Sequence, residues 1–203
     1  MKLYYSPGAC SLSPHIALLE AGLPYDLVKV DVRAKKLENG DDYLKINPKG
    51  QVPALGLDNG ELLTEGPVIV QMIADKASGK NLAPANGSTE RYRLQEWLNF
   101  ITSELHKNFS PLFQPALTDE TKGFFKDRLM GKFKYLDSQL AAHDYLMGKQ
   151  FTVADGYLFV MLKWADRTKI DLSGMKNLMA FKDRMAARPN VQAALKMEGL
   201  LKA

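Results

Sequence analysis

Apolar residues follow two different rhythms along the chain. In the first part, residues 2–5 and 25–32 are short β-prone runs, and the second run (YDLVKVDV) alternates polar and apolar side chains. The stretch between them, residues 6–24, reads as a loop and a helix that Ser11 or Ser13 can cap at its start. A strand, a helix and a second strand in this order predict a right-handed βαβ unit with parallel strands.

A hairpin is predicted next. The apolar runs at residues 52–57 and 61–64 are separated by Asp-Asn-Gly, which is a strong signal for a tight turn between antiparallel strands. Glu65-Gly66-Pro67 then opens an apolar helix, and its proline is suited to the first helical turn. The first part of the chain therefore reads as βαβ followed by ββα.

The rhythm changes after residues 79–89, a stretch rich in Gly, Pro, Asn and Ser that we interpret as a linker region. Beyond it, apolar residues recur at three- and four-residue steps, which is typical of amphipathic helices. Helices are predicted over residues 90–113, 120–142, 157–164 and 175–187, with a short last helix from Asn190 to near Gly199.

Two domains are expected from this pattern. Residues 1–80 form an α/β domain, residues 88–203 form an all-helical domain, and residues 81–87 link them. The run at 157–164 is apolar nearly all round, so its helix should be central and buried. Residues 152–155 (Thr-Val-Ala-Asp) form a capping box at the start of that helix.

Composition excludes several classes of protein. The 203 residues are 46% hydrophobic, enough for a sizeable core, and no apolar run is long enough for a transmembrane helix or a secretory signal. The net charge is +4, but basic and acidic residues are mixed, so no nucleic-acid partner is expected. A mild positive charge still favours small anionic ligands. We therefore expect a cytoplasmic protein that binds neither membranes nor nucleic acid.

The single cysteine, Cys10, precludes an internal disulfide and fits a reducing compartment. It lies beside the start of the first predicted helix, where partial positive charge favours a thiolate. It is either an inert small hydrophobe or a reactive thiol. Ser13 occupies the second position of a CxxC motif, so disulfide chemistry would need an external thiol.

Two short motifs each allow a structural and a functional interpretation. Val52-Pro53 is either the edge of a strand or a cis peptide that exposes the preceding backbone to a ligand. Glu65-Gly66 is either a favourable helix start or a binding site for an α-amino acid terminus. In the second case, the Gly66 N–H holds a carboxylate and Glu65 accepts from an ammonium group.

Asn99, Ser103 and His106 are spaced to share one helical face. They are either satisfied polar residues at a helix contact or part of a site. His106 is the one histidine that we consider for chemistry, since His15 falls within the first helix and His143 in a loop. Three scattered histidines and one cysteine make no metal-ligand spacing, so no metal is expected.

Five stretches together resemble the glutathione transferase superfamily, and specifically its bacterial beta class. They are MKLYYSPGACSLSPHIAL, NPKGQVPAL, LLTEGPVIVQ, EWLNFITSELHKNFSPLF and FTVADGYLF, and the resemblance covers essentially the whole chain. It implies a thioredoxin-like N-terminal domain, an all-helical C-terminal domain and a homodimer. It also implies glutathione as the co-substrate.

The resemblance implies a role for each matching position in the N-terminal part. The backbone before the Val52-Pro53 turn would pair with the cysteinyl part of glutathione, Glu65-Gly66 would hold the γ-glutamyl end, and Lys35 would contact the glycine carboxylate. Many members of the family have Ser where this chain has Gly66. One hydroxyl contact is then missing, and weaker binding is expected.

The resemblance also implies the catalytic residues. Cys10 would lie against the glutathione sulfur, Ser11 could donate to the thiolate, and His106 would lie near the same sulfur. Asn99 and Ser103 would reach the site from the partner subunit.

We therefore expect a detoxifying transferase that conjugates the glutathione thiolate to apolar electrophiles, with Phe109, Phe113 and Trp164 as walls of the second site between the domains. One alternative is glutathione-dependent thiol-disulfide exchange or reductive dehalogenation through Cys10. Another is a ligand-binding protein that keeps the fold without turnover.

Overall fold

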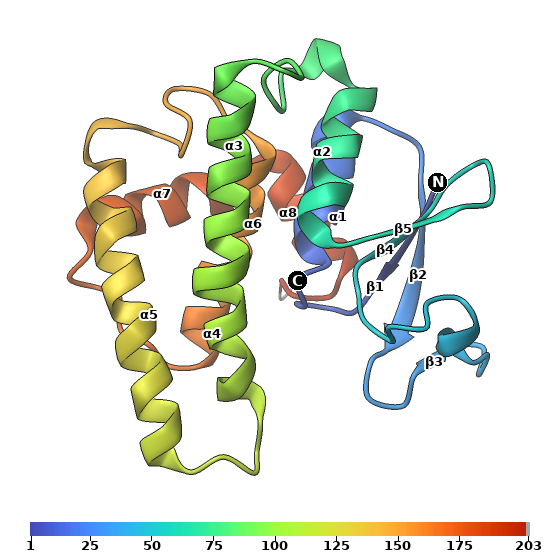
Figure 1. Cartoon of the computed structure of the whole chain (residues 1–203), viewed down its shortest axis with the longest axis horizontal. Helices are drawn as coiled ribbons and strands as arrows, with labels where there is room; N and C mark the ends of the chain where they lie inside the picture. The colour runs from blue at the N-terminus through green and yellow to red at the C-terminus, as the bar shows by residue number, and fades with distance from the viewer. Residues whose placement is uncertain (202–203) are drawn as a thin grey trace. The chain divides into compact units, whose positions relative to one another are not determined.

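The computed structural model describes residues 1–201, and these residues divide into two units. The sheet unit comprises Met1–Ala83 together with the segment that begins at Arg188, and the helical unit comprises Pro84–Ala187. The predicted division differs in one respect, because it placed the last helix with the helical domain. Figure 1 shows the strands of the sheet unit as arrows in blue and cyan.

The sheet has five strands in the order β3-β2-β1-β4-β5. The strands are β1 (Lys2–Tyr5), β2 (Asp26–Asp31), β3 (Lys36–Leu37), β4 (Ala54–Gly56) and β5 (Leu62–Thr64). β1 and β2 are parallel and β4 and β5 antiparallel, so both the βαβ unit and the hairpin are confirmed. β3 was not predicted, because a two-residue strand has too few positions to show a hydrophobic alternation.

Three helices complete the sheet unit: α1 (Leu12–Ala21), α2 (Gly66–Lys76) and α8 (Pro189–Met197). Two short 3-10 turns, η1 (Tyr43–Lys45) and η2 (Ser78–Lys80), belong to the same unit. Helix α1 contacts both α2 and α8, and Figure 1 shows α1 and α2 next to each other beside the sheet. Leu3, Ile16, Leu55 and Ile69 are fully buried between these layers.

Polar contacts hold α8 on α1. Arg188 and Asn190 each donate to the carboxylate of Glu20, at 2.8 and 3.0 Å. At the other end of α8, the carboxylate of Glu198 is buried and lies 2.9 Å from Nδ1 of His15. These contacts explain why α8 belongs to the sheet unit. In sequence α8 follows the helices of the helical unit, so its position along the chain suggested the other unit.

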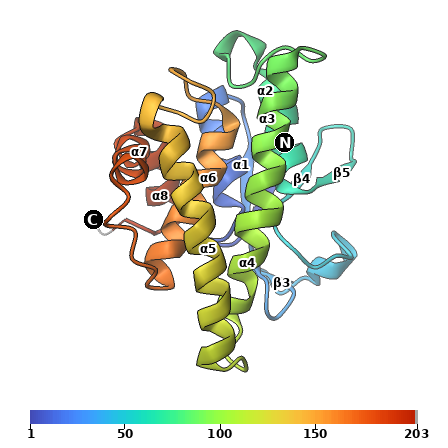
Figure 2. The ribbon, with the colours of Figure 1, turned by 60° about the vertical axis from the view of Figure 1, so that its left-hand side comes forward.

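The helical unit contains α3 (Thr89–Phe100), α4 (Lys107–Phe109), α5 (Asp119–Gln139), α6 (Val153–Arg167) and α7 (Lys176–Ala186). Its 3-10 turns are η4 (Ser110–Phe113) and η5 (Leu140–Ala142). α3 continues into α4 through a π-helical turn, η3 (Ile101–His106). The helix predicted over residues 90–113 is thus one helical path with a change of pitch, and it runs alongside α5 (Figure 2).

Helix α6 is the buried centre of the helical unit, as the sequence predicted. Every residue from Val153 to Leu162 is buried. The capping box is confirmed at its start, where the Asp155 carboxylate accepts from the Thr152 backbone N–H at 2.7 Å. The same carboxylate accepts from the backbone N–H of Leu146 at 2.8 Å, so it also holds the preceding loop.

Candidate functional site

The Cys10 thiol lies where the loop after β1 meets the start of α1. Its Sγ donates to the carbonyl oxygen of Val52 at 3.1 Å, and the residue is half-buried. The Val52-Pro53 peptide bond is cis, as one of the two sequence interpretations required. The structure therefore brings together two motifs that lie 42 positions apart in the chain.

Ser11 occupies the N-cap position of α1, but its hydroxyl does not cap the helix. It is fully buried, accepts from the backbone N–H of Ser6 at 3.1 Å and donates to the Ser6 carbonyl at 3.2 Å. A hydroxyl has one proton to give. Because that proton is directed to Ser6, the expected donation from Ser11 to a thiolate is corrected to a structural role in the loop that carries Cys10.

The loop before the cis-proline is fixed by side chains from three directions. Tyr43 and Asn47 both donate to the carbonyl oxygen of Gln51, each at 2.8 Å. Lys35 donates from Nζ to the carbonyl oxygen of Gly50 at 2.7 Å. A lysine ammonium has three donors, so this contact leaves Lys35 able to reach a carboxylate as well.

Glu65 starts α2 in a conformation that side chains rarely adopt, with φ +70°. Its carbonyl oxygen accepts from the backbone N–H groups of Val68 and Ile69, and its side chain is exposed. Residues held at positive φ cost free energy and cluster at functional sites. The first N–H groups of a helix, here beginning with Gly66, have no partner within the helix and can hold an anion.

Lys49 was not among the predicted site residues. Its Nζ lies 2.6 Å from Oε1 of Glu65 and 2.9 Å from the hydroxyl of Thr64. Its position in the turn before the cis-proline, next to the predicted site, was the available signal. The ion pair joins the turn before Pro53 to the start of α2, 16 positions later in the chain. Hydrophobic periodicity carries no information about such a contact between polar side chains.

His106 belongs to the helical unit and is half-buried against α6. Its Nδ1 lies 2.5 Å from the hydroxyl of Tyr157, and its ring meets the edge of Trp164 at a centroid distance of 4.9 Å. Burial, with a smaller contribution from the nearby Lys107, lowers the pKa of His106 to about 4. His106 is therefore neutral at neutral pH, so its ring carries one proton, and Nδ1 shares one hydrogen bond with the Tyr157 hydroxyl.

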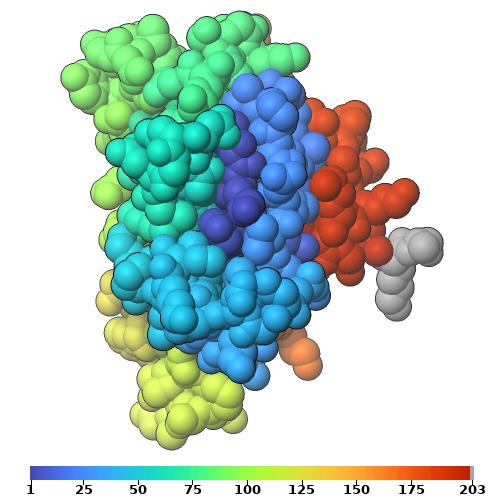
Figure 3. Space-filling view, turned by 90° about the vertical axis from the view of Figure 1, so that its right-hand side faces the viewer, coloured from blue at the N-terminus to red at the C-terminus, as the bar shows by residue number. Residues whose placement is uncertain are grey.

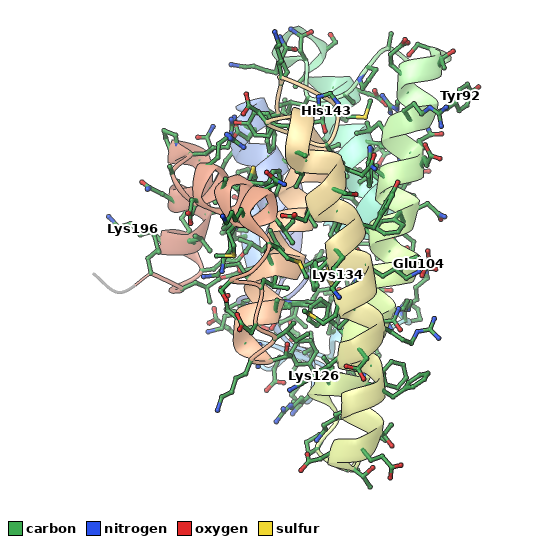
Figure 4. All side chains as sticks on the ribbon, turned by 90° about the vertical axis from the view of Figure 1, so that its left-hand side faces the viewer. Tyr92, Glu104, Lys126, Lys134, His143 and Lys196 are labelled. Carbon is green, nitrogen blue, oxygen red and sulfur yellow. The ribbon has the colours of Figure 1, made fainter. Side chains whose placement is uncertain are left out.

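The predicted shared face of Asn99, Ser103 and His106 is wrong. Asn99 and Ser103 are exposed, and the Ser103 hydroxyl donates to the Asn99 carbonyl at 3.1 Å, whereas His106 packs on α6. The π-helical turn advances by a smaller angle per residue than an α-helix, so it rotates His106 away from the other two. Figure 4 shows Glu104, from the same turn, beside α5, where its carboxylate lies 2.8 Å from Nζ of Lys132.

The three predicted aromatic walls form one cluster in the helical unit. Phe113 and Phe109 each meet the ring of Trp164 edge-on, at 5.1 and 5.8 Å. Phe109 is fully buried, so it supports the cluster and does not line a surface. Phe113 is half-buried, and the guanidinium of Arg167 lies 5.3 Å from its ring centre.

Residues 1–201 contain neither a metal-binding cluster nor a membrane-spanning helix. No group of three or more His, Cys, Asp or Glu side chains in this range could hold a metal ion. No helix in the same range is long and apolar enough to cross a membrane.

Comparison with known proteins places these features in a family. Residues 8–76 match the family described as "Glutathione S-transferase, N-terminal domain", and residues 103–198 match "Glutathione S-transferase, C-terminal domain". The chain is 50% identical over 200 residues to the glutathione S-transferase GstA of Escherichia coli O157:H7, covering 98% of this chain and 100% of that protein.

Solved structures agree. A ternary complex of BphK, described as a bacterial GST, has a TM-score of 0.97 and 58% identity, covering 98% of this chain and 100% of that one. A sphingomonad glutathione S-transferase complexed with glutathione has a TM-score of 0.95 and 50% identity, covering 99% and 100%. A bacterial beta class glutathione S-transferase from Sphingomonas chungbukensis has a TM-score of 0.96 and 51% identity, again covering 99% and 100%. The chain belongs to the glutathione S-transferase family, with bacterial beta class members among its homologues.

Proposed function

We propose that this protein binds glutathione in its sheet unit and conjugates the glutathione thiolate to apolar electrophiles, as in detoxification. The observation that carries the proposal is the contact of the Cys10 thiol with the carbonyl that precedes the cis-proline Pro53. It places a half-buried sulfur at a helix N-terminus, where an anion is favoured. A homologue of 50% identity that was solved with glutathione supports it.

Each part of glutathione has a proposed partner. The backbone of Val52, before Pro53, pairs with the cysteinyl part, the Glu65 carboxylate accepts from the γ-glutamyl ammonium, and the N–H of Gly66 donates to the adjacent carboxylate. Lys35 reaches the glycine carboxylate from its place over the Gly50 loop. These assignments use the chemistry that each side chain offers.

The chemistry follows from the surroundings of the sulfur. The glutathione thiol loses its proton to solvent, and the N-terminus of α1 stabilises the resulting thiolate. The Cys10 thiol adds a hydrogen bond when its proton turns from the Val52 carbonyl to the glutathione sulfur. His106 contributes a hydrogen bond and no positive charge, because its pKa is near 4. The thiolate then forms a carbon–sulfur bond, and the leaving group departs with the bonding electrons. Phe113 and Trp164 offer the apolar second substrate a wall in the helical unit.

The active form is proposed to be a cytoplasmic homodimer. Asn99 and Ser103 are exposed on the helical unit, which supports their reaching the glutathione site of the partner subunit. A lone cysteine suits a reducing compartment. The family matches at 8–76 and 103–198 support a sequence division into 1–80 and 88–203, joined by 81–87, although α8, from the second range, packs in the sheet unit.

Thiol exchange is the second candidate, because the Cys10 sulfur is partly accessible. In that reaction the Cys10 thiolate attacks a substrate–glutathione disulfide and releases the substrate thiol. A second glutathione thiolate then attacks the Cys10–glutathione mixed disulfide, which gives oxidised glutathione and restores the Cys10 thiolate.

Substitutions at Cys10 and His106 separate these possibilities. Conjugation is followed by the absorbance of a chloronitrobenzene product, and exchange by reduction of a mixed disulfide. Conjugation should fall by at least about tenfold in Cys10→Ala or in His106→Ala, since a single hydrogen bond to an anion is worth about 1.5–3 kcal/mol. Little loss in both variants would show that the thiolate-stabilising roles are misassigned. Loss of all activity in Cys10→Ala alone would favour the exchange reaction.

A further inference from the structure

Lys49 forms an ion pair with Glu65 but has no part in the contacts to glutathione proposed above. Nζ of Lys49 lies 2.6 Å from Oε1 of Glu65, and the two side chains are 53% and 62% exposed. Such a solvated pair stabilises a fold by only about 0–1 kcal/mol. Stability alone therefore gives little reason for an ion pair at this place.

The backbone that presents Lys49 is held firmly. The Lys49 N–H donates to Oδ1 of Asn47 at 3.1 Å, and Asn47 is 2% exposed. The other end of the Asn47 side chain donates to the Gln51 carbonyl, on the far side of Lys49. The surface in Figure 3 includes this light-blue loop and the cyan junction of β5 with α2. The backbone of Lys49 is thus fixed, and its flexible side chain reaches the start of α2 with its charged end.

The pair retains capacity for a ligand. A lysine ammonium has three donors, of which Oε1 of Glu65 and the Thr64 hydroxyl take two. A carboxylate accepts at both oxygens, so Oε2 of Glu65 is available in addition to Oε1. The N–H of Gly66 follows directly in the chain. The start of α2 therefore offers a ligand three groups: the ammonium of Lys49, the carboxylate of Glu65 and the backbone N–H of Gly66.

We propose that Lys49 binds the α-carboxylate of the γ-glutamyl end of glutathione, beside the N–H of Gly66, while Oε2 of Glu65 accepts from the adjacent ammonium. The inference rests on the proposed function, because it presumes that glutathione binds at Glu65-Gly66. The Lys49 ammonium and the Glu65 carboxylate lie side by side. The γ-glutamyl end is a zwitterion that carries its carboxylate and its ammonium on one carbon, so each of its charges meets an opposite charge of this pair. Lys49 then supplies the charge-assisted contact that the absent Gly66 hydroxyl cannot.

The test compares two ligands by calorimetry: glutathione and γ-aminobutyryl-cysteinylglycine, which keeps the amino group and lacks the α-carboxylate. Lys49→Met should weaken binding of glutathione by about tenfold and leave binding of the analogue unchanged, because only glutathione carries the group that Lys49 holds. Lys49→Arg should keep most of the affinity for glutathione. Lys45→Met removes an exposed charge from the same unit and should change neither ligand's affinity.

The outcomes are distinct. Equal affinity of wild type and Lys49→Met for glutathione overturns the inference, and so does an equal loss for both ligands, which would mean that Lys49 only orients Glu65. If Lys45→Met loses as much affinity for glutathione as Lys49→Met, the loss comes from the lower net charge of the protein and not from a contact of Lys49. That result also overturns the inference. Failure of wild type to bind glutathione refutes the proposed function itself.

Discussion

The Sγ of Cys10 lies 3.1 Å from the carbonyl oxygen of Val52, the residue before the cis-proline. The contact fixes the distance between the start of α1 and the loop that precedes β4. A ligand whose backbone pairs with this loop would present its side chain toward the same helix N-terminus. The proposed binding of the cysteinyl part of glutathione rests on this relationship.

Gly66→Ser should bind glutathione more tightly than wild type. A Cβ at Gly66 would meet only Cγ of Pro53, at the ordinary distance of 3.7 Å, so the serine fits without displacement. Its hydroxyl would add a hydrogen bond to the carboxylate, worth about 1 kcal/mol or roughly a fivefold gain in affinity. Calorimetric titration measures the gain. Gly66→Ala is the control, and a serine variant that binds no better than the alanine variant would contradict the assignment.

His106 should make the protein lose stability in mild acid. Its pKa is about 4 in the folded chain against 6.5 when unfolded, so the unfolded chain binds more protons below neutral pH. The contribution of His106 to the free energy of unfolding should fall by about 2 kcal/mol between about pH 7 and pH 5. Urea denaturation at both values gives the difference. His106→Gln should show a smaller decrease, and an equal decrease in both proteins would rule out a depressed pKa.

Gly50→Ala should unfold more easily than its matched control Gly60→Ala. Both glycines have positive φ, +59° and +87°, so both variants carry backbone strain of about 1 kcal/mol. A Cβ at Gly50 would also lie 3.0 Å from Cδ2 of Leu44 and 3.2 Å from the Lys35 stem, whereas nothing lies within 4 Å at Gly60. The crowding should cost about 1 kcal/mol more at Gly50, the low end for overpacking, because Leu44 is 43% exposed and can shift. Equal urea midpoints for the two variants would refute this account.

Local signals predicted most of the fold. The Asp-Asn-Gly turn between the strands and the Thr152–Asp155 capping box act within a few residues, so sequence patterns report them directly. The packing of α8 on α1 depends on partners such as Glu20 and Arg188, which are 168 positions apart. The spacing of apolar residues along the chain does not report contacts between positions so far apart in sequence.

The site was predicted less completely, for the same reason. The Val52-Pro53 bond is cis, as the resemblance implied, and the structure adds the contact of Cys10 with the Val52 carbonyl. The partner of the Ser11 hydroxyl and the Lys49–Glu65 pair depend on how loops fold back. The π-helical turn from Ile101 to His106 has no clear sequence signature, so helical spacing grouped the wrong residues.

The most direct test of the central claim is a calorimetric titration of the purified protein with reduced glutathione. We predict saturable binding near one equivalent per chain, since each chain carries one Cys10 and one Glu65-Gly66 motif. The affinity should fall in Glu65→Gln, which removes the charge that accepts the γ-glutamyl ammonium. Absence of detectable heat at millimolar glutathione would contradict the account and favour a binding protein that keeps the fold without its co-substrate.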